Sequence, residues 1–140
     1  GYVVAPAALM AEFRKVHQFN VFTVNTPMQY ALADYMADAS RHLGLAAFYQ
    51  AKRDRFRAAM AASRFELLPC SGTYFQLARY RAIRDESDMA FVEWLTRDKK
   101  VAAIPVSAFS AAAEDEGVVR FCFAKHDDTL DAACERLVAL

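Results

Sequence analysis

The sequence lacks a net charge and long apolar runs. Its 17 basic and 17 acidic side chains cancel over 140 residues. Nucleic-acid and anionic-membrane binders depend on net positive charge, so this balance argues against both classes. No apolar run has the length or flanks of a membrane span or a signal peptide, and we expect neither. The chain starts with Gly1 rather than Met, which predicts a processed or excised piece of a longer protein.

Cysteine and histidine are also scarce. The three cysteines form an odd set without C-x-x-C spacing, and each lies among apolar residues: Cys70, Cys122 and Cys134. This usage favours a reducing compartment, so we expect a cytoplasmic protein. The three histidines show neither HExxH nor Cys/His spacing, and we therefore expect no metal site.

Apolar periodicity predicts several helices followed by short strands. Residues 1–5 read as the end of a strand, and helical spacing continues to residue 64 around an extended segment at 20–25. The later elements follow the order β-β-α-β-β-α, beginning with a hairpin around Gly72. The length suits one moderate core. The fold class we expect is α/β (α+β), in which helices cover a small mixed sheet.

Two helix starts and one helix end carry local signals. Pro6 stands at the favoured first position of a helix. Thr26, Pro27 and Gln29 predict an N-cap with a capping box at the start of the next helix. Gly44 predicts the stop or kink that ends this second helix.

A basic run lies on the following helix, which we predict over 45–64. Its members are Lys52, Arg53, Arg55 and Arg57, with Asp54 among them. One interpretation is a phosphate-binding face. The other is a solvated helix flank, which is what most charge runs are.

Arg120 is the most informative residue of the chain. It lies in the apolar run 118–123 (VVRFCF), which predicts a strand. Strand side chains alternate faces, so the arginine points away from Val119, Phe121 and Phe123. A guanidinium on a rigid strand suits a ligand carboxylate, which it can grip with two parallel hydrogen bonds. The alternative is an edge-strand arginine that faces water or pairs with a distant acid.

Seven short segments, taken in order, resemble a single family. They are 16–18 (VHQ), 25–29 (NTPMQ), 52–54 (KRD), 69–75 (PCSGTYF), 94–96 (WLT), 103–109 (AIPVSAF) and 120–125 (RFCFAK). The series closely resembles the C-terminal part of class I and II (fold type I) pyridoxal-phosphate aminotransferases. It is most similar to the methionine and kynurenine/glutamine transaminase branch, some of whose members also cleave cysteine S-conjugates. The similarity runs over the whole chain.

The resemblance implies a division of the chain and a role for Arg120. Residues 1–44 would be the end of the large cofactor domain and a connector. Residues 45–140 would be the small C-terminal domain with a long interdomain helix. Arg120 would match the family arginine that grips the α-carboxylate of the substrate.

Four more residues gain expected roles in a substrate pocket from the resemblance. Asn20 and Phe22 match a connector that, in family dimers, reaches towards the neighbouring subunit's active site. An apolar contact there suits methionine or aromatic amino acids better than aspartate. Ser107 and Phe109 match a mobile loop that closes over the substrate. The alternatives are that Phe22 fills the dimer interface and that the loop residues only pack at a strand end.

The resemblance also implies a cofactor and partners. The family moves an amino group from an amino acid, here methionine, aromatic or glutamine-like, to a 2-oxo acid through pyridoxal 5'-phosphate, and it acts as a homodimer. The Schiff-base lysine would lie upstream of Gly1, since none of the five lysines sits in the matching motif. We therefore expect this chain to be inactive alone and to hold little of the cofactor.

Two other hypotheses remain. The first is a non-catalytic α/β module that binds a small carboxylate ligand through Arg120. The second, nucleic-acid binding by the basic run, is disfavoured by the charge balance.

Overall fold

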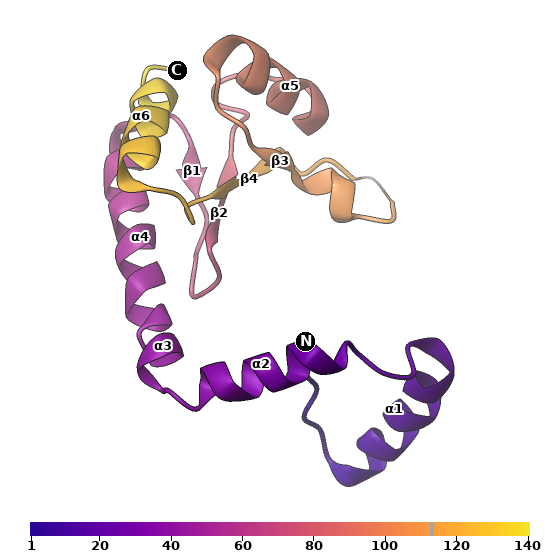
Figure 1. Cartoon of the computed structure of the whole chain (residues 1–140). Coiled ribbons are helices and arrows are strands. Elements are labelled where there is room, and N and C mark those ends of the chain that lie inside the picture. The colour runs from indigo at the N-terminus through magenta and orange to yellow at the C-terminus, as the bar shows by residue number, and fades with distance from the viewer. Residues whose placement is uncertain (113) are drawn as a thin grey trace. The chain divides into compact units, whose positions relative to one another are not determined.

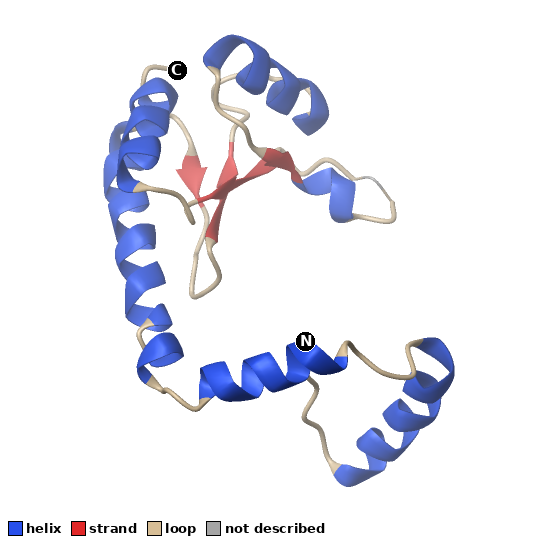
Figure 2. Cartoon of the chain, in the orientation of Figure 1, coloured by secondary structure: helices blue, strands red, loops and turns tan. Residues whose placement is uncertain are grey.

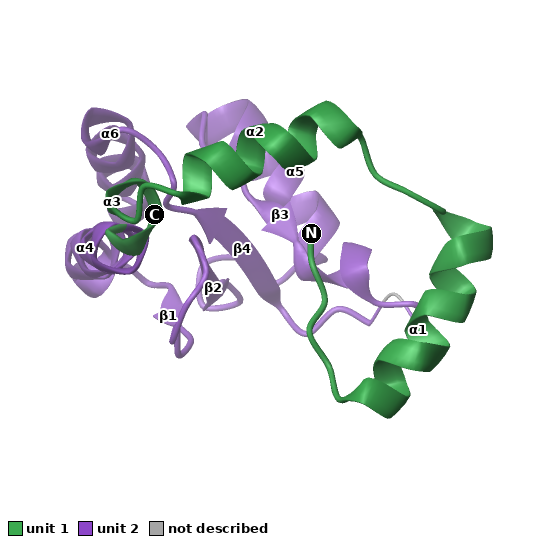
Figure 3. Ribbon diagram, turned by 60° about the horizontal axis from the view of Figure 1, so that its bottom comes forward, with its two compact units in different colours: residues 1–44 green, residues 45–140 purple. Residues whose placement is uncertain are grey.

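The computed structural model describes residues 1–112 and 114–140. These residues form two compact units, Gly1–Gly44 and Leu45–Leu140 (Figure 3). Within these ranges no helix is both long and apolar enough to cross a bilayer. The assignment of the first unit to a larger cofactor domain stays a prediction.

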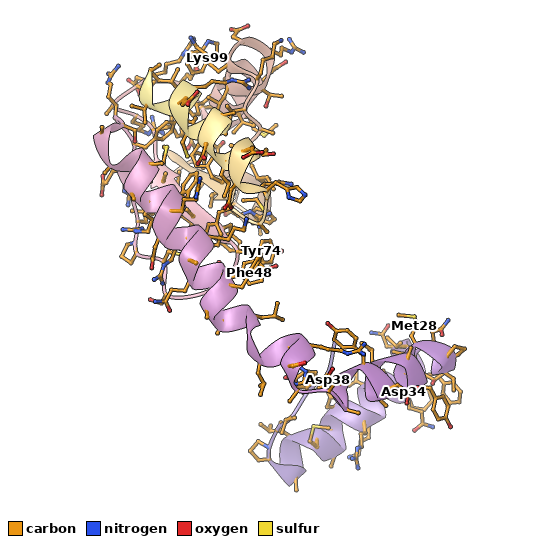
Figure 4. The ribbon with its side chains drawn as sticks, turned by 60° about the vertical axis from the view of Figure 1, so that its left-hand side comes forward. Met28, Asp34, Asp38, Phe48, Tyr74 and Lys99 are labelled. Carbon is orange, nitrogen blue, oxygen red and sulfur yellow. The ribbon has the colours of Figure 1, made fainter. Side chains whose placement is uncertain are left out.

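The first unit is built from helices, which are α1 (Ala7–Asn20), α2 (Thr26–Met36) and α3 (Ser40–Leu43) (Figure 1). None of its residues is buried. Many large apolar side chains are exposed instead, among them Leu9, Phe13, Val16, Phe19, Met28, Tyr30, Leu32 and Met36. Figure 4 shows the side chain of Met28 projecting from α2. This unit therefore has no core of its own.

The start of the chain differs from expectation. Residues 1–5 form no strand, because the described part of this unit offers no second strand to pair their backbone groups. Pro6 is the N-cap of α1 rather than its first residue. Its carbonyl oxygen accepts a hydrogen bond from the Met10 N–H at 3.0 Å.

The cap of α2 also lies one residue earlier than expected. Asn25, not Thr26, is the N-cap, and its Oδ1 accepts the Met28 N–H at 3.1 Å. Gln29 donates its Nε2 to the Val24 carbonyl instead of closing a capping box. A short amide side chain satisfies a free helix N–H as well as a hydroxyl does, and here it is the better placed of the two.

The second unit combines helices with a four-stranded sheet (Figure 2). Its elements are α4 (Leu45–Ala59), η1 (Met60–Ala62), β1 (Glu66–Leu67), β2 (Phe75–Arg79), α5 (Asp88–Lys99), β3 (Ile104–Pro105), η2 (Val106–Phe109), β4 (Val118–Cys122) and α6 (Asp127–Val138). The expected class, helices over a small sheet, is confirmed. The η2 turn contains Ser107 and Phe109, which the resemblance assigns to a mobile loop.

The sheet is antiparallel in all three of its described pairings, whereas a mixed sheet was expected. The strand order is β1-β2-β4-β3. β2 and β3 run in the same direction, as a crossover through a helix predicts. β4 lies between them and runs in the opposite direction, so the two parallel strands never pair.

The core lies on one face of this sheet. Residues opposite each other in neighbouring strands share a face, which places Gln76, Ala78, Val119 and Phe121 together. α4, α5 and α6 contribute buried side chains against this face, among them Phe56, Phe91, Leu95, Leu130 and Leu137. Val119, Phe121 and Phe123, which the strand alternation places on one face, are all buried.

The tip of the hairpin packs against α4 through aromatic rings. Phe48 and Tyr74 both lie at this end of the unit (Figure 4). Tyr49 links them, because its ring centroid lies 5.1 Å from that of Phe48 and 6.4 Å from that of Tyr74. These contacts hold the loop before β2 on the helix.

The basic run on α4 makes internal ion pairs, which neither interpretation anticipated. Lys52 Nζ lies 2.6 Å from Asp127 Oδ1, and Arg55 Nε lies 3.0 Å from Asp131 Oδ1. Hydrogen bonds from Lys52 and Arg55 lower the pKa of Asp127 and Asp131 respectively. The other members donate to the hairpin backbone, Arg53 to the Cys70 carbonyl and Arg57 to the Leu68 carbonyl. The run thus ties α4 to α6 and to the hairpin.

The two units predict different behaviour of two fragments. Residues 45–140 contain the whole described core, so we expect this fragment to fold and to stay soluble. Residues 1–140 add the exposed apolar side chains of the first unit, and we expect this longer fragment to self-associate. Circular dichroism and sedimentation of both fragments test the prediction. An unfolded 45–140 fragment, or a strictly monomeric 1–140 fragment, would contradict it.

Candidate functional site

Arg120 lies on the sheet face opposite the core. It occupies the middle of β4, with Leu77 of β2 and Ile104 of β3 as its direct partners. The three core helices pack on the other face, so Arg120 is half-buried among strand residues rather than under a helix. A rigid central strand therefore fixes its backbone.

Two phenylalanine rings cover the guanidinium. Arg120 Cζ lies 4.8 Å from the ring centroid of Phe75 and 5.1 Å from that of Phe109. The rings come from both sides of β4, because Phe75 is on β2 and Phe109 follows β3. Aromatic rings attract the flat face of a guanidinium and leave the donors along its edge available. The arrangement removes water from the charge without using its hydrogen bonds.

The Arg120 donors have no acceptor in the part of the chain that the structure describes. Its Nε is buried without a hydrogen-bond partner, and no carboxylate of residues 1–112 or 114–140 forms an ion pair with it. A buried unpaired donor costs about 1–3 kcal/mol, and more for a charged group. Such a donor is therefore poised to receive an anionic ligand.

Of the two expected loop residues, Phe109 contacts Arg120, whereas Ser107 is hydrogen-bonded to Asp88. Phe109 is 65% exposed and touches the site through its ring. Ser107 donates its N–H to Asp88 Oδ2 and its hydroxyl to Asp88 Oδ1, both at 2.8 Å. These bonds agree with a packing role for the Ser107 side chain at the strand end.

Asn20 and Phe22 lie in the first unit, so the structure does not place them relative to Arg120. Asn20 is the last residue of α1. Phe22 has a positive φ of 67° and is 74% exposed, and its N–H donates to the His17 carbonyl at 2.8 Å. Their expected role in the substrate pocket stays a prediction.

Sequence reasoning missed Asp88, which is 2% exposed at the start of α5. Its N–H donates to Asp115 Oδ2 at 3.0 Å, and Ser87 supplies the helix cap. Burial raises the pKa of the nearby Tyr80 to about 12, and the Asp115 charge adds to this effect. Only the acidic first turn after a serine hinted at Asp88, and that pattern normally marks an exposed helix start.

The lysines of this chain do not fit covalent attachment of the expected cofactor. Lys52 donates its Nζ to Asp127 Oδ1 at 2.6 Å and to the Lys125 carbonyl at 2.7 Å. The remaining ones lie in the first unit, at the end of α5 or after β4: Lys15, Lys99, Lys100 and Lys125. Within the described ranges no group of His, Cys, Asp and Glu could hold a metal ion. The described residues do offer one half-buried guanidinium without an acceptor, that of Arg120.

The chain resembles known proteins over nearly its whole length. The family model for aminotransferase class I and II matches residues 1–137. The methionine aminotransferase of Escherichia coli is 51% identical over 138 residues, covering 98% of this chain and 36% of that protein. Kynurenine–oxoglutarate transaminase 3 of Rattus norvegicus is 35% identical over 155 residues, covering 96% of this chain and 34% of that protein. The chain thus spans about a third of the length of these relatives.

Solved structures show the same fold. The Escherichia coli protein YbdL, with methionine aminotransferase function, superposes with a TM-score of 0.85 at 50% identity, over 98% of this chain and 36% of that one. The N-succinyldiaminopimelate aminotransferase of Mycobacterium tuberculosis superposes with a TM-score of 0.78 at 34% identity, over 96% of this chain and 36% of that one.

Proposed function

The chain belongs to the family of class I and II aminotransferases, and we propose that it supplies the carboxylate-binding side of the active site in a longer enzyme. That enzyme moves the amino group of methionine, an aromatic amino acid or a glutamine-like amino acid to a 2-oxo acid. Members of this family use pyridoxal 5'-phosphate, which supplies the electron sink for this chemistry. Because the lysines present do not fit its attachment, that role is expected from residues outside this chain.

One observation carries the proposal, the guanidinium of Arg120 covered by two rings and left without an acceptor in the described residues. Low local dielectric strengthens its attraction for a carboxylate. The planar fork also fixes the orientation of the bound acid, and positioning of a reacting bond can lower a barrier by several kcal/mol. Arg120 is thus suited to orient the α-carboxylate of an amino acid.

The surroundings of Arg120 support a neutral substrate side chain. Phe75, Leu77, Ile104 and Phe109 give the site apolar walls. Apolar walls favour a thioether or an aromatic ring over a second carboxylate. A carboxylate there would lose its bound water and gain no hydrogen bond or opposite charge in return. The relatives named for methionine and kynurenine support the same class.

We also propose a homodimer in the cytoplasm. The exposed apolar side chains of α1 and α2 support burial against the rest of the protein or a second copy. Three free cysteines support a reducing compartment. Sedimentation of the full-length protein tests the dimer.

A transamination assay of the full-length protein tests the function. Methionine, phenylalanine, glutamine and aspartate are offered with a 2-oxo acid, and amino-group transfer is followed by product analysis. We expect at least one of the first three to exceed aspartate in kcat/KM by about tenfold or more. The purified protein should also absorb visible light through its cofactor. Absence of transfer from all four amino acids would refute the proposal.

The non-catalytic module is not favoured. Its basis was Arg120 alone, whereas the relatedness to aminotransferases extends over 98% of the chain.

A further inference from the structure

Asp88 is the only buried charged residue in the described core region, and the carboxylate-binding role of Arg120 does not use it. It is 2% exposed and lies on α5, on a different element from Arg120. Both of its carboxylate oxygens are engaged by Ser107, at 2.8 Å each. A buried carboxylate whose two oxygens both accept hydrogen bonds from one residue of a short turn fixes the position of that turn.

The turn that Asp88 holds carries Phe109. Ser107 and Phe109 both belong to η2, Val106–Phe109, and the Ser110 N–H closes the turn on the Ser107 carbonyl at 3.0 Å. Phe109 itself is 65% exposed, so little other than its own backbone sets its position. Its ring nevertheless lies 5.1 Å from Arg120 Cζ.

The same end of α5 also holds the chain on its return towards β4. The Asp88 N–H donates to Asp115 Oδ2, while Asp115 Oδ1 accepts the Gly117 N–H at 2.7 Å, directly before β4. Asp88 therefore contacts the connection at two points, with its carboxylate near the start and with its backbone near the end. The start of α5 thus anchors the segment that leads to Arg120 by hydrogen bonds.

We infer that Asp88 is a positioning residue for substrate carboxylate binding, acting through Ser107 and the η2 turn to keep the Phe109 ring over the Arg120 guanidinium. The inference rests on the proposed function of Arg120. Asp88 lies outside the site, and through the Phe109 ring it limits the access of water to the Arg120 guanidinium. Removal of the Asp88 carboxylate removes both acceptors of Ser107, which frees the turn, uncovers the guanidinium and weakens its binding of the substrate acid.

A double-mutant cycle in the full-length enzyme tests the inference. Asp88→Ala, which removes both acceptors of Ser107, should raise KM for methionine about fivefold and change kcat by less than about twofold, because binding is weakened and the reacting groups are intact. In a Phe109→Ala background the same substitution should change KM by less than about 1.5-fold, since the ring it positions is gone. Ser107→Ala, which removes one of the two bonds, should act in the same direction and more weakly. Asp98→Ala, at an exposed position of the same helix, is the matched control and should leave KM unchanged.

Equal effects of Asp88→Ala with and without Phe109 would overturn the inference, as would a lower melting temperature with unchanged KM. Fluorine NMR of 4-fluorophenylalanine at position 109 gives a readout that needs no activity. We expect one narrow resonance in the parent protein and a shifted or broadened one after Asp88→Ala, and an unchanged spectrum would refute the inference. If the parent protein transfers no amino group, the proposed function fails, while this spectrum still decides the role of Asp88.

Discussion

Arg120→Ala in the full-length enzyme is expected to lower kcat/KM for methionine by about 100- to 1,000-fold. Removing one partner of a desolvated charge pair costs about 2–5 kcal/mol, and 1.36 kcal/mol corresponds to tenfold. The guanidinium is covered by Phe75 and Phe109 and has no acceptor in the described residues, so its loss removes the carboxylate receptor without freeing an internal acid. Steady-state kinetics with methionine, phenylalanine and glutamine measure the effect, which should be similar for all three.

Arg120→Lys separates charge from geometry. Lysine keeps the positive charge but lacks the planar fork, so we expect an intermediate loss of about 10- to 100-fold, mainly in KM. Arg97→Ala is the control, since the Arg97 side chain is 75% exposed on α5 and its ion pair within the described residues is with Glu93 of the same helix. Unchanged kcat/KM in Arg120→Ala, or equal losses in the control, would remove Arg120 from the site.

Phe91→Ala is expected to destabilise the second unit by about 3–5 kcal/mol, the usual cost of emptying a large buried aromatic site. Phe91 is fully buried on α5, and its ring stacks on that of Tyr80 at 4.1 Å. It also meets the Phe65 ring edge-on at 6.1 Å. Its loss opens a cavity between α5 and the sheet that these rings cannot close.

Urea unfolding of the full-length protein, followed by circular dichroism and tryptophan fluorescence, measures this loss. Trp94 lies 5.5 Å from Phe91 between ring centroids and reports directly on the region. Met89→Ala is the matched control, because Met89 is on the same helix and is 59% exposed. We expect the control to shift the unfolding free energy by less than about 0.5 kcal/mol. Similar midpoints for both variants would show that α5 is not part of the core.

The alternation of side chains made β4 predictable. Val119, Phe121 and Phe123 are apolar at every second position, and that period can place them only on one face. Arg120 then falls on the other face regardless of tertiary detail. The direction of each strand was not encoded in the same way. A crossover helix predicts parallel neighbours, and nothing in the local pattern shows that β4 inserts between β2 and β3.

The sequence pattern did not predict which polar side chains are buried. In β2, Phe75 and Leu77 are more apolar than Gln76, yet Gln76 is the fully buried residue. It is accommodated because Arg57 donates to its Oε1 at 2.7 Å and its Nε2 donates to the Leu68 carbonyl. Such partners lie on other elements and leave no local signal.

The same limit applied to the supports of the site. Asp88 and Ser107 are 19 residues apart, and only the fold brings them together. The pairing of the α4 basic run with α6 is also long-range, which is why the run was interpreted as a solvated or ligand-binding face. The family resemblance implied roles for Arg120, Ser107 and Phe109, but it gave no sign of Asp88, which binds Ser107.

Equilibrium binding of two unreactive ligands to the full-length protein tests the central claim most directly. One is the analogue of methionine that lacks the amino group, and the other is its carboxamide, which has the same shape without the charge. Calorimetry should show that the parent protein binds the acid at least about 30-fold more tightly than the amide. This preference should fall to within about threefold in Arg120→Ala. No preference in the parent protein, or a preference that survives in the variant, would contradict the account.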